Sequence, residues 1–173
     1  MRVRVFYRKI GNVIEFMSYA TGFIAGWMII GAGVLMMSEL VTRYVLRRPL
    51  IIADELSGYA MVGIGLLGLA FTFQQKSHIR ITFLTSVLPP KVSKCVRLLT
   101  LGVAAIWVAI ASKSSLSLVQ SSFQRGIRSI TLLMTPLAWP QMAIALGFIV
   151  LLLMIILNIA KTINNSRSMT GEE

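Results

Sequence analysis

Four long apolar runs decide what this chain of 173 residues can fold into. They cover roughly residues 13–37, 56–73, 98–111 and 132–160. A helix needs about 20 apolar residues to cross the hydrocarbon core of a bilayer. Because the third run lies inside a longer helical stretch that starts near residue 92, each run can supply one such helix. We therefore expect an all-α integral membrane protein with four transmembrane helices.

The composition indicates that lipid, rather than water, surrounds much of the chain. It is 56% hydrophobic and 13% charged, whereas a soluble domain is about half apolar and about one-quarter charged. The net charge of +11 comes from short clusters of bases between the apolar runs. These clusters lack the basic stripe with interleaved aromatic residues that is typical of nucleic-acid binding. We expect membrane lipids, and not nucleic acid, as the partners of these bases.

No internal repeat or soluble domain separates the runs, so we expect one four-helix membrane domain over residues 1–165 and a polar tail over residues 166–173. The first run is too long for the core of a signal peptide, and no small-residue cleavage site follows a short apolar stretch. We expect it to be retained as a span. Residues 77–88 predict a short amphipathic helix at the membrane interface, which Pro89 and Pro90 end.

The distribution of bases predicts the orientation of the spans, because cytoplasmic loops of membrane proteins carry an excess of lysine and arginine. One side would carry eleven bases: Arg2, Arg4, Arg8, Lys9, Lys76, Arg80, Lys91, Lys94, Arg97, Lys161 and Arg167. The other side would carry six bases: Arg43, Arg47, Arg48, Lys113, Arg125 and Arg128. We expect both termini to lie in the cytoplasm.

Charges of both signs flank the loop between the first two runs. Asp54 and Glu55 open the second run, where the helix dipole favours negative charge, and this effect alone explains their position. Arg43, Arg47 and Arg48 stand on the other side of the loop. We hypothesise that these arginines pair with the two carboxylates or that the charges meet a partner chain. Neither carboxylate lies deep enough in the bilayer to act as a proton relay.

Two charged positions depend on how far the helices continue. Glu39 lies four residues before Arg43, so the two side chains can pair if the first helix extends to Tyr44. Lys113 interrupts the third span. Either one long helix accommodates it with its amine reaching toward the interface, or it pairs inside a protein interface.

Small residues mark candidate packing faces on the first two spans. Gly22 and Gly26 form a GxxxG pair in the first, and Gly58 and Gly65 share one face of the second, with Gly68 one turn beyond. Such residues let helices approach closely, although glycine is also simply common in membrane helices. We hypothesise that these faces meet other helices.

Residues that could carry catalysis or hold a cofactor are scarce. His78, the single histidine, lies between the bases Lys76 and Arg80, where a structural or headgroup-facing role is more common than a ligand role. One histidine does not supply the pair of imidazoles that a membrane haem usually takes, and the single Cys95 allows neither an internal disulfide nor a thiolate metal site. The spans also lack paired deep charges and two-half symmetry. We therefore expect an accessory or scaffold subunit without a cofactor, rather than an enzyme or a self-sufficient transporter.

The stretch RYVLRRPLIIADELSGYAMVGIGLLGLAFTFQQKSHIRITFL resembles the signature region of the small membrane subunit of tripartite ATP-independent periplasmic (TRAP) transporters, the DctQ-like family. The similar elements are Arg43-Tyr44, Asp54-Glu55, Gly65 to Ala70, Lys76, His78-Ile79, Leu88-Pro89 and Thr135-Pro136. The number and length of the spans match over nearly the whole chain. The chain departs from the family at Ile52, where tryptophan is common, and at Thr82, where an acid is common.

The resemblance implies a multi-pass protein of the bacterial inner membrane with two partners. A large elevator-type membrane subunit would carry the organic acid, such as a dicarboxylate or sialic acid, and use the sodium gradient. A periplasmic substrate-binding protein would dock transiently. This chain would anchor the static scaffold, with its glycine faces toward the large subunit. Its arginine and carboxylate corner would lie at the periplasmic edge, and Lys76, His78 and Arg80 at the cytoplasmic interface.

Two other functions fit the residues themselves. The chain could be an accessory or assembly subunit of another membrane complex. It could also be a small membrane enzyme whose site is shared with another chain.

Overall fold

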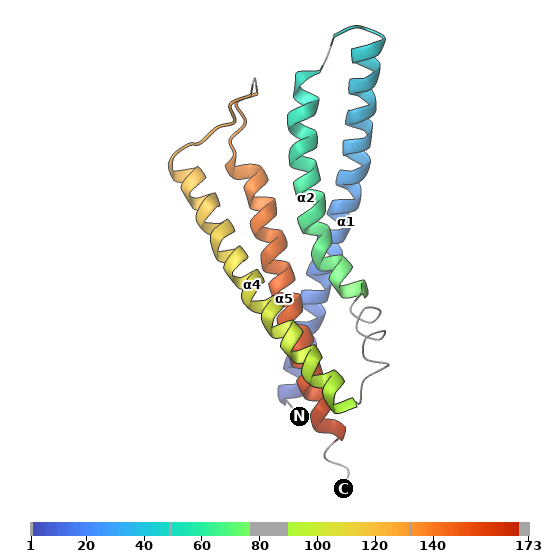
Figure 1. Ribbon diagram of the computed structural model, residues 1–173, viewed down its shortest axis with the longest axis vertical. Helices are drawn as coiled ribbons and strands as arrows, with labels where there is room; N and C mark the ends of the chain where they lie inside the picture. The colour runs from blue at the N-terminus through green and yellow to red at the C-terminus, as the bar shows by residue number, and fades with distance from the viewer. Residues whose placement is uncertain (1, 49, 77–89, 132, 170–173) are drawn as a thin grey trace.

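The structure is a computed structural model that describes residues 2–48, 50–76, 90–131 and 133–169. Within these ranges the chain folds into helices α1 (Arg2–Tyr44), α2 (Ile51–Lys76), α4 (Pro90–Gln124) and α5 (Ala138–Met169), shown in Figure 1. Each of the four contains a segment long and apolar enough to cross a membrane. The expected all-α architecture with four candidate spans is confirmed. The amphipathic helix expected over residues 77–88 lies outside the described residues.

The helices continue beyond the apolar runs that predicted them. α1 has 43 residues and is roughly 64 Å long at 1.5 Å per residue, about twice the ~30 Å thickness of a hydrocarbon core. α1 ends at Tyr44, so Glu39 and Arg43 both lie on the helix, as their pairing across one turn requires. α4 runs through Lys113 as one helix, with the lysine exposed. α5 extends to Met169, into the residues expected to form the polar tail.

The start of the fourth span differs from the prediction, because α5 begins at Ala138 rather than near residue 132. α4 ends in a glycine cap: Gly126 adopts a positive φ of 59°, and the Ile127 amide donates to the Ser122 carbonyl at 3.1 Å. The chain then forms a hairpin-like loop in which the Leu137 amide donates back to the Ile127 carbonyl at 3.1 Å. The apolar residues of this loop made it look like the first turns of the helix.

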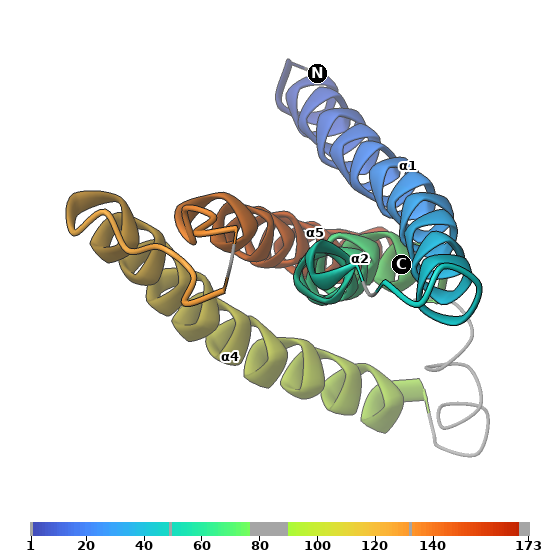
Figure 2. The ribbon, with the colours of Figure 1, turned by 90° about the horizontal axis from the view of Figure 1, so that it is seen from above.

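α5 is the helix around which the others are arranged. It packs against α4, α2 and α1, while α2 also packs against α1 (Figure 2). One-third of the apolar segment of α5 is buried (33%), against 11% in α1 and in α4. The core where α2, α4 and α5 meet consists of Ala70, Leu101, Val150, Leu151 and Ile155.

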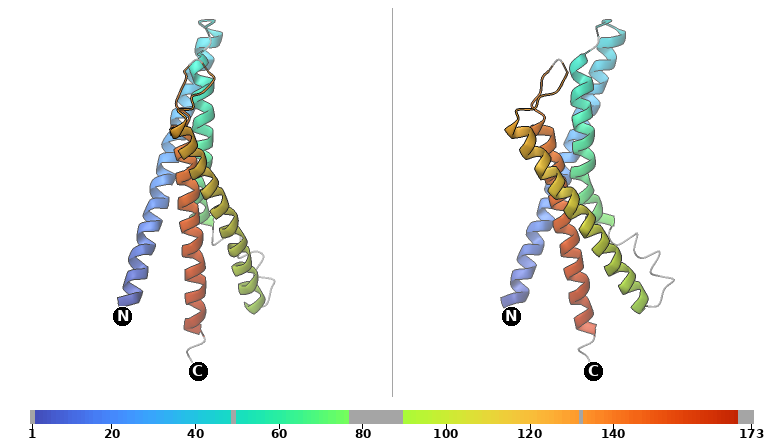
Figure 3. Two further views of the ribbon diagram at one scale, coloured as in Figure 1. Left: turned by 90° about the vertical axis from the view of Figure 1, so that its left-hand side faces the viewer. Right: turned by 60° about the vertical axis from the view of Figure 1, so that its left-hand side comes forward.

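In Figure 3 the helices splay apart toward the end of the bundle that carries both chain termini, whereas in the view of Figure 1 they spread toward the opposite end. Much of each helix therefore contacts no other part of the described chain, and exposed apolar side chains cover α1 and α4. In a membrane protein such surfaces face lipid or another subunit. Which side of the membrane the shared end faces stays a prediction.

α2 and α5 approach each other closely at a glycine that faces a backbone carbonyl. A Cβ atom placed on the buried Gly147 of α5 would lie 2.7 Å from the carbonyl oxygen of Leu66 on α2. Real Cβ atoms do not approach a backbone oxygen so closely, and a backbone atom cannot swing aside. Gly147 is therefore what allows α2 to reach α5.

We predict that Gly147→Ala destabilises the isolated chain in detergent by about 1–3 kcal/mol, because the added methyl group forces the two backbones apart. The control is Gly102→Ala on α4, where no atom lies within 4 Å of the added Cβ. Chemical unfolding followed by circular dichroism measures both. Equal unfolding midpoints for the two variants would contradict the close approach of α2 to α5 at Gly147.

Candidate functional site

The end of the bundle opposite the termini brings together three parts of the chain. These are the end of α1, the start of α2 and the loop between α4 and α5 (Figure 1). The arginines and carboxylates that flank the loop between the first two apolar runs lie at this end. In the structure, polar side chains from all three parts contact one another.

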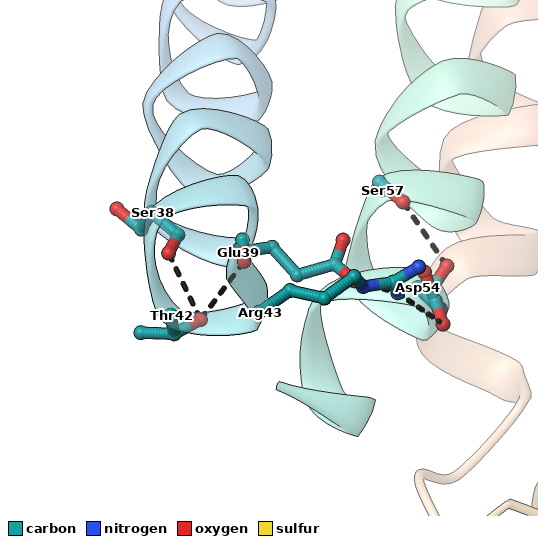
Figure 4. Close-up of polar contacts among 6 residues, drawn as sticks. All are labelled: Ser38, Glu39, Thr42, Arg43, Asp54 and Ser57. Atoms are coloured by element: carbon teal, nitrogen blue, oxygen red, sulfur yellow. Dashed lines mark hydrogen bonds and ion pairs between the residues drawn. The ribbon is translucent and has the colours of Figure 1, made fainter. Parts of the chain in front are cut away.

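Arg43 joins α1 to α2 (Figure 4). Its guanidinium forms an ion pair with Glu39 one turn earlier on α1, as the four-residue spacing predicts. The same nitrogen lies 3.9 Å from Oδ2 of Asp54 in the first turn of α2. Glu39 is only 7% exposed, so its charge needs a partner such as this one. Asp54 is exposed, and its contact with Arg43 is correspondingly weak.

Glu55 has neutral partners instead of arginines. The Tyr59 hydroxyl donates to Oε1 at 2.6 Å, and the Thr131 hydroxyl donates to Oε2. Thr131 belongs to the loop between α4 and α5, and its hydroxyl also lies 2.7 Å from the hydroxyl of Ser129. Glu55 thus fastens that loop to α2, which is a different role from the arginine pairing that we hypothesised.

Arg47 and Arg48 extend into solvent at the turn after α1, and neither forms an ion pair with a described residue. Arg47 has a positive φ of 54°, a conformation that side chains usually avoid. The Arg48 amide donates to the Thr42 carbonyl at 3.1 Å, which closes the turn. These two guanidinium groups are therefore free to meet something outside the chain, whereas Arg43 is engaged within it.

The five candidate glycines divide into two groups. Gly22 lies against the Phe71 side chain of α2, where an added Cβ would approach to 2.5 Å, and Gly68 faces Ala25 of α1. Both are used inside the chain. Within the described ranges, Gly26, Gly58 and Gly65 have no atom within 4 Å of an added Cβ.

Of the cytoplasmic set expected from the sequence, Lys76 is the last residue of α2, and His78 and Arg80 lie outside the described residues. The described residues at this end supply two other polar contacts. Lys161 of α5 forms an ion pair with Glu15 of α1, and Arg97 of α4 donates to Asn158 of α5.

We call the cluster of Glu39, Arg43, Asp54, Glu55 and Thr131 the charged corner. Its contacts connect the ends of helices to one another. Its charged and hydroxyl groups bond to one another across α1, α2 and the α4–α5 loop. Over the part of the chain that the structure describes, no group of three or more histidine, cysteine or acidic side chains could hold a metal ion. The exposed arginines add positive charge next to this corner.

Comparison with known proteins gives the family. Residues 32–165 match the family described as "Tripartite ATP-independent periplasmic transporters, DctQ component". The chain belongs to this family. It is therefore a DctQ component of a TRAP transporter, a transport protein and not an enzyme. The match spans the charged corner and the helices that hold it.

A curated relative of this DctQ chain is the "Sialic acid TRAP transporter permease protein SiaT" of Haemophilus influenzae (strain 86-028NP). The two are 29% identical over 72 residues, which cover 42% of this chain and 12% of the relative. The matched segment is thus a small part of a much longer protein. No solved structure matches the chain.

Sequence reasoning missed the partners of Glu55. Tyr59 lies four residues after it on a helix, so that spacing could have indicated the contact. Thr131 lies 76 residues away along the chain, and no pattern in the sequence connects the two positions.

We predict that Glu55→Ala loosens the α4–α5 loop, because the loop loses its polar attachment to α2. Hydrogen–deuterium exchange of the amides in residues 127–137 should become severalfold faster. Asp54→Asn is the control: it changes the neighbouring carboxylate but leaves the contact of Glu55 with Thr131 intact. Unchanged loop protection in Glu55→Ala would show that this contact does not hold the loop.

Proposed function

We propose that this DctQ chain is the small scaffold subunit of a sodium-driven TRAP transporter that imports an organic acid. A large elevator-type membrane subunit would move the substrate and use the sodium gradient. A periplasmic binding protein would deliver the substrate. The family match is the observation that carries the proposal. The relative named as a sialic acid transporter supports an organic acid, such as sialic acid or a dicarboxylate, as the substrate class.

The structure supports a scaffold role through what its helices leave uncovered. The apolar segments of α1, α2 and α4 are at most 17% buried within the chain. So little internal burial is expected of a subunit whose exposed apolar surface is covered by a partner and by lipid. A fixed element of this kind would widen the static part of the transporter against which a mobile domain can move.

The orientation belongs to the same proposal. The excess of bases near the shared end of the termini favours the cytoplasm for that end, in the bacterial inner membrane. The charged corner would then face the periplasm, with Arg47 and Arg48 exposed toward the binding protein. Residues 1–165 would form the membrane domain.

The open glycines indicate where the large subunit would pack. Gly58 and Gly65 are seven residues apart and therefore lie on the same side of α2, and no described residue of this chain lies within 4 Å of a Cβ added there. Gly26 leaves a similar opening on α1. Because small residues let a neighbouring helix approach closely, we place the contact with the large subunit on one of these two faces.

We predict that Gly65→Leu or Gly26→Leu lowers co-purification of the large subunit roughly tenfold, since a bulky side chain blocks close helix packing. Each variant should itself remain as stable as the wild-type chain. Gly102→Leu, an open glycine on α4, is the matched control. Gly22→Leu should instead destabilise the chain itself, because its side chain would collide with Phe71. Full recovery of the complex from both open-face variants would contradict this placement.

We also propose that the charged corner stiffens the surface that the binding protein meets. Asp54→Lys with Glu55→Lys would place two cations beside Arg43 and release the α4–α5 loop. We predict that substrate uptake in reconstituted vesicles falls while the large subunit still co-purifies. Asp54→Asn alone should have a small effect, because its contact with Arg43 is exposed. Unchanged uptake by the double variant would refute the role of the corner.

A further inference from the structure

Arg97 is the one cation in the described part of the bundle with a buried donor atom that lacks a hydrogen-bond partner. It lies within the membrane-spanning segment of α4, in its first turns, and is partly buried against α5. One Nη nitrogen donates to Oδ1 of Asn158 at 3.3 Å. The Nε nitrogen is buried and has no hydrogen-bond partner among the described residues. A guanidinium carries five N–H donors, and an ionised group near the edge of a membrane normally finds an anion.

The chain offers this guanidinium no carboxylate among its described residues. Glu39, Asp54 and Glu55 lie at the opposite end of the bundle. Glu15 lies at the same end as Arg97 but forms the ion pair with Lys161. The two remaining acids of the sequence, Glu172 and Glu173, lie outside the described residues. A counter-anion for Arg97 would therefore come from outside the described part of the chain.

The position of Arg97 favours a phospholipid as the source of that anion. Asn158, which orients the guanidinium, lies three residues before Lys161, about 4.5 Å along α5. Both contacts thus lie at the level where the apolar segment of α5 ends, which is the depth of lipid headgroups. The neighbouring Val96 and Leu99 of α4 expose apolar side chains that acyl chains can cover.

The chemistry of the group fits a phosphate. The planar guanidinium presents parallel N–H donors that match two phosphate oxygens, and Asn158 already fixes its plane through one nitrogen. Basic sites between transmembrane helices on the cytoplasmic side are typical binding sites for anionic lipid headgroups.

We propose that Arg97 and Asn158 form a binding site for the phosphate of an anionic phospholipid between α4 and α5. The bound lipid supplies the missing counter-anion and ties α4 to α5 where the helices splay apart. The site depends only on this chain and its membrane, so it holds whether or not the proposed transport function is correct.

Native mass spectrometry of the full chain in mild detergent tests the site, with phosphatidylglycerol or phosphatidylcholine added to delipidated protein. The wild-type chain should bind one phosphatidylglycerol molecule in preference to phosphatidylcholine. Arg97→Gln should weaken that binding roughly tenfold or more, because it removes a charge-assisted contact. The affinity of Arg97→Lys should lie between those of the wild-type chain and Arg97→Gln, since lysine keeps the charge but lacks the parallel N–H donors of the guanidinium. Arg125→Gln, the same change beyond the other end of α4, should leave binding unchanged.

Three results would overturn the inference. Equal lipid binding by Arg97→Gln and Arg125→Gln would mean that the lipid does not use this site. If inorganic phosphate bound the delipidated chain at Arg97 as tightly as phosphatidylglycerol does, the site would be one for a free anion and not for a lipid. Phosphatidylglycerol binding by a chain truncated after Met169 but not by the full chain would show that the terminal glutamates occupy Arg97. Retention of the fold in each variant is checked by circular dichroism, so a misfolded variant is not mistaken for loss of the site.

Discussion

The close approach of α5 to its neighbours is the contact on which the rest of this structure depends. Helices in a bilayer gain little from hydrophobic burial when they associate, because lipid tails are as apolar as their side chains. Their association depends on tight packing, which small residues permit. Gly147 lets α5 touch the backbone of α2, and Gly22 lets α1 close over Phe71. These contacts hold the middle of the bundle together, while the ends of the helices diverge.

Polar contacts also join the helices at the two ends of the bundle. At one end, Arg43 contacts Asp54 across α1 and α2, and Glu55 bonds the α4–α5 loop to α2. At the other end, Lys161 and Asn158 connect α5 to α1 and α4. Between them, most of the apolar surface of α1, α2 and α4 is not covered by the described chain. The family match establishes the class of this bundle, a DctQ component of a TRAP transporter, and the scaffold role is our proposal for it.

Local patterns in the sequence predicted much of this fold, and distant contacts account for what they missed. Span length and apolar content predicted four helices, and the spacing of Glu39 and Arg43 predicted their pair. The late start of α5 was missed because apolar residues fill the preceding loop. The bond between Thr131 and Glu55 depends on how α4 and α5 return the chain to α2. Likewise, only the packing shows that Gly22 is used internally while Gly65 is open.

The most direct test of the scaffold function is affinity purification of this chain from its native membrane in mild detergent, followed by identification of the proteins that accompany it. We expect a large polytopic membrane protein in a ratio of about one to one, since the family works as a multi-component transporter. A stable homo-oligomer of this chain alone, with no larger membrane protein attached, would contradict the scaffold function.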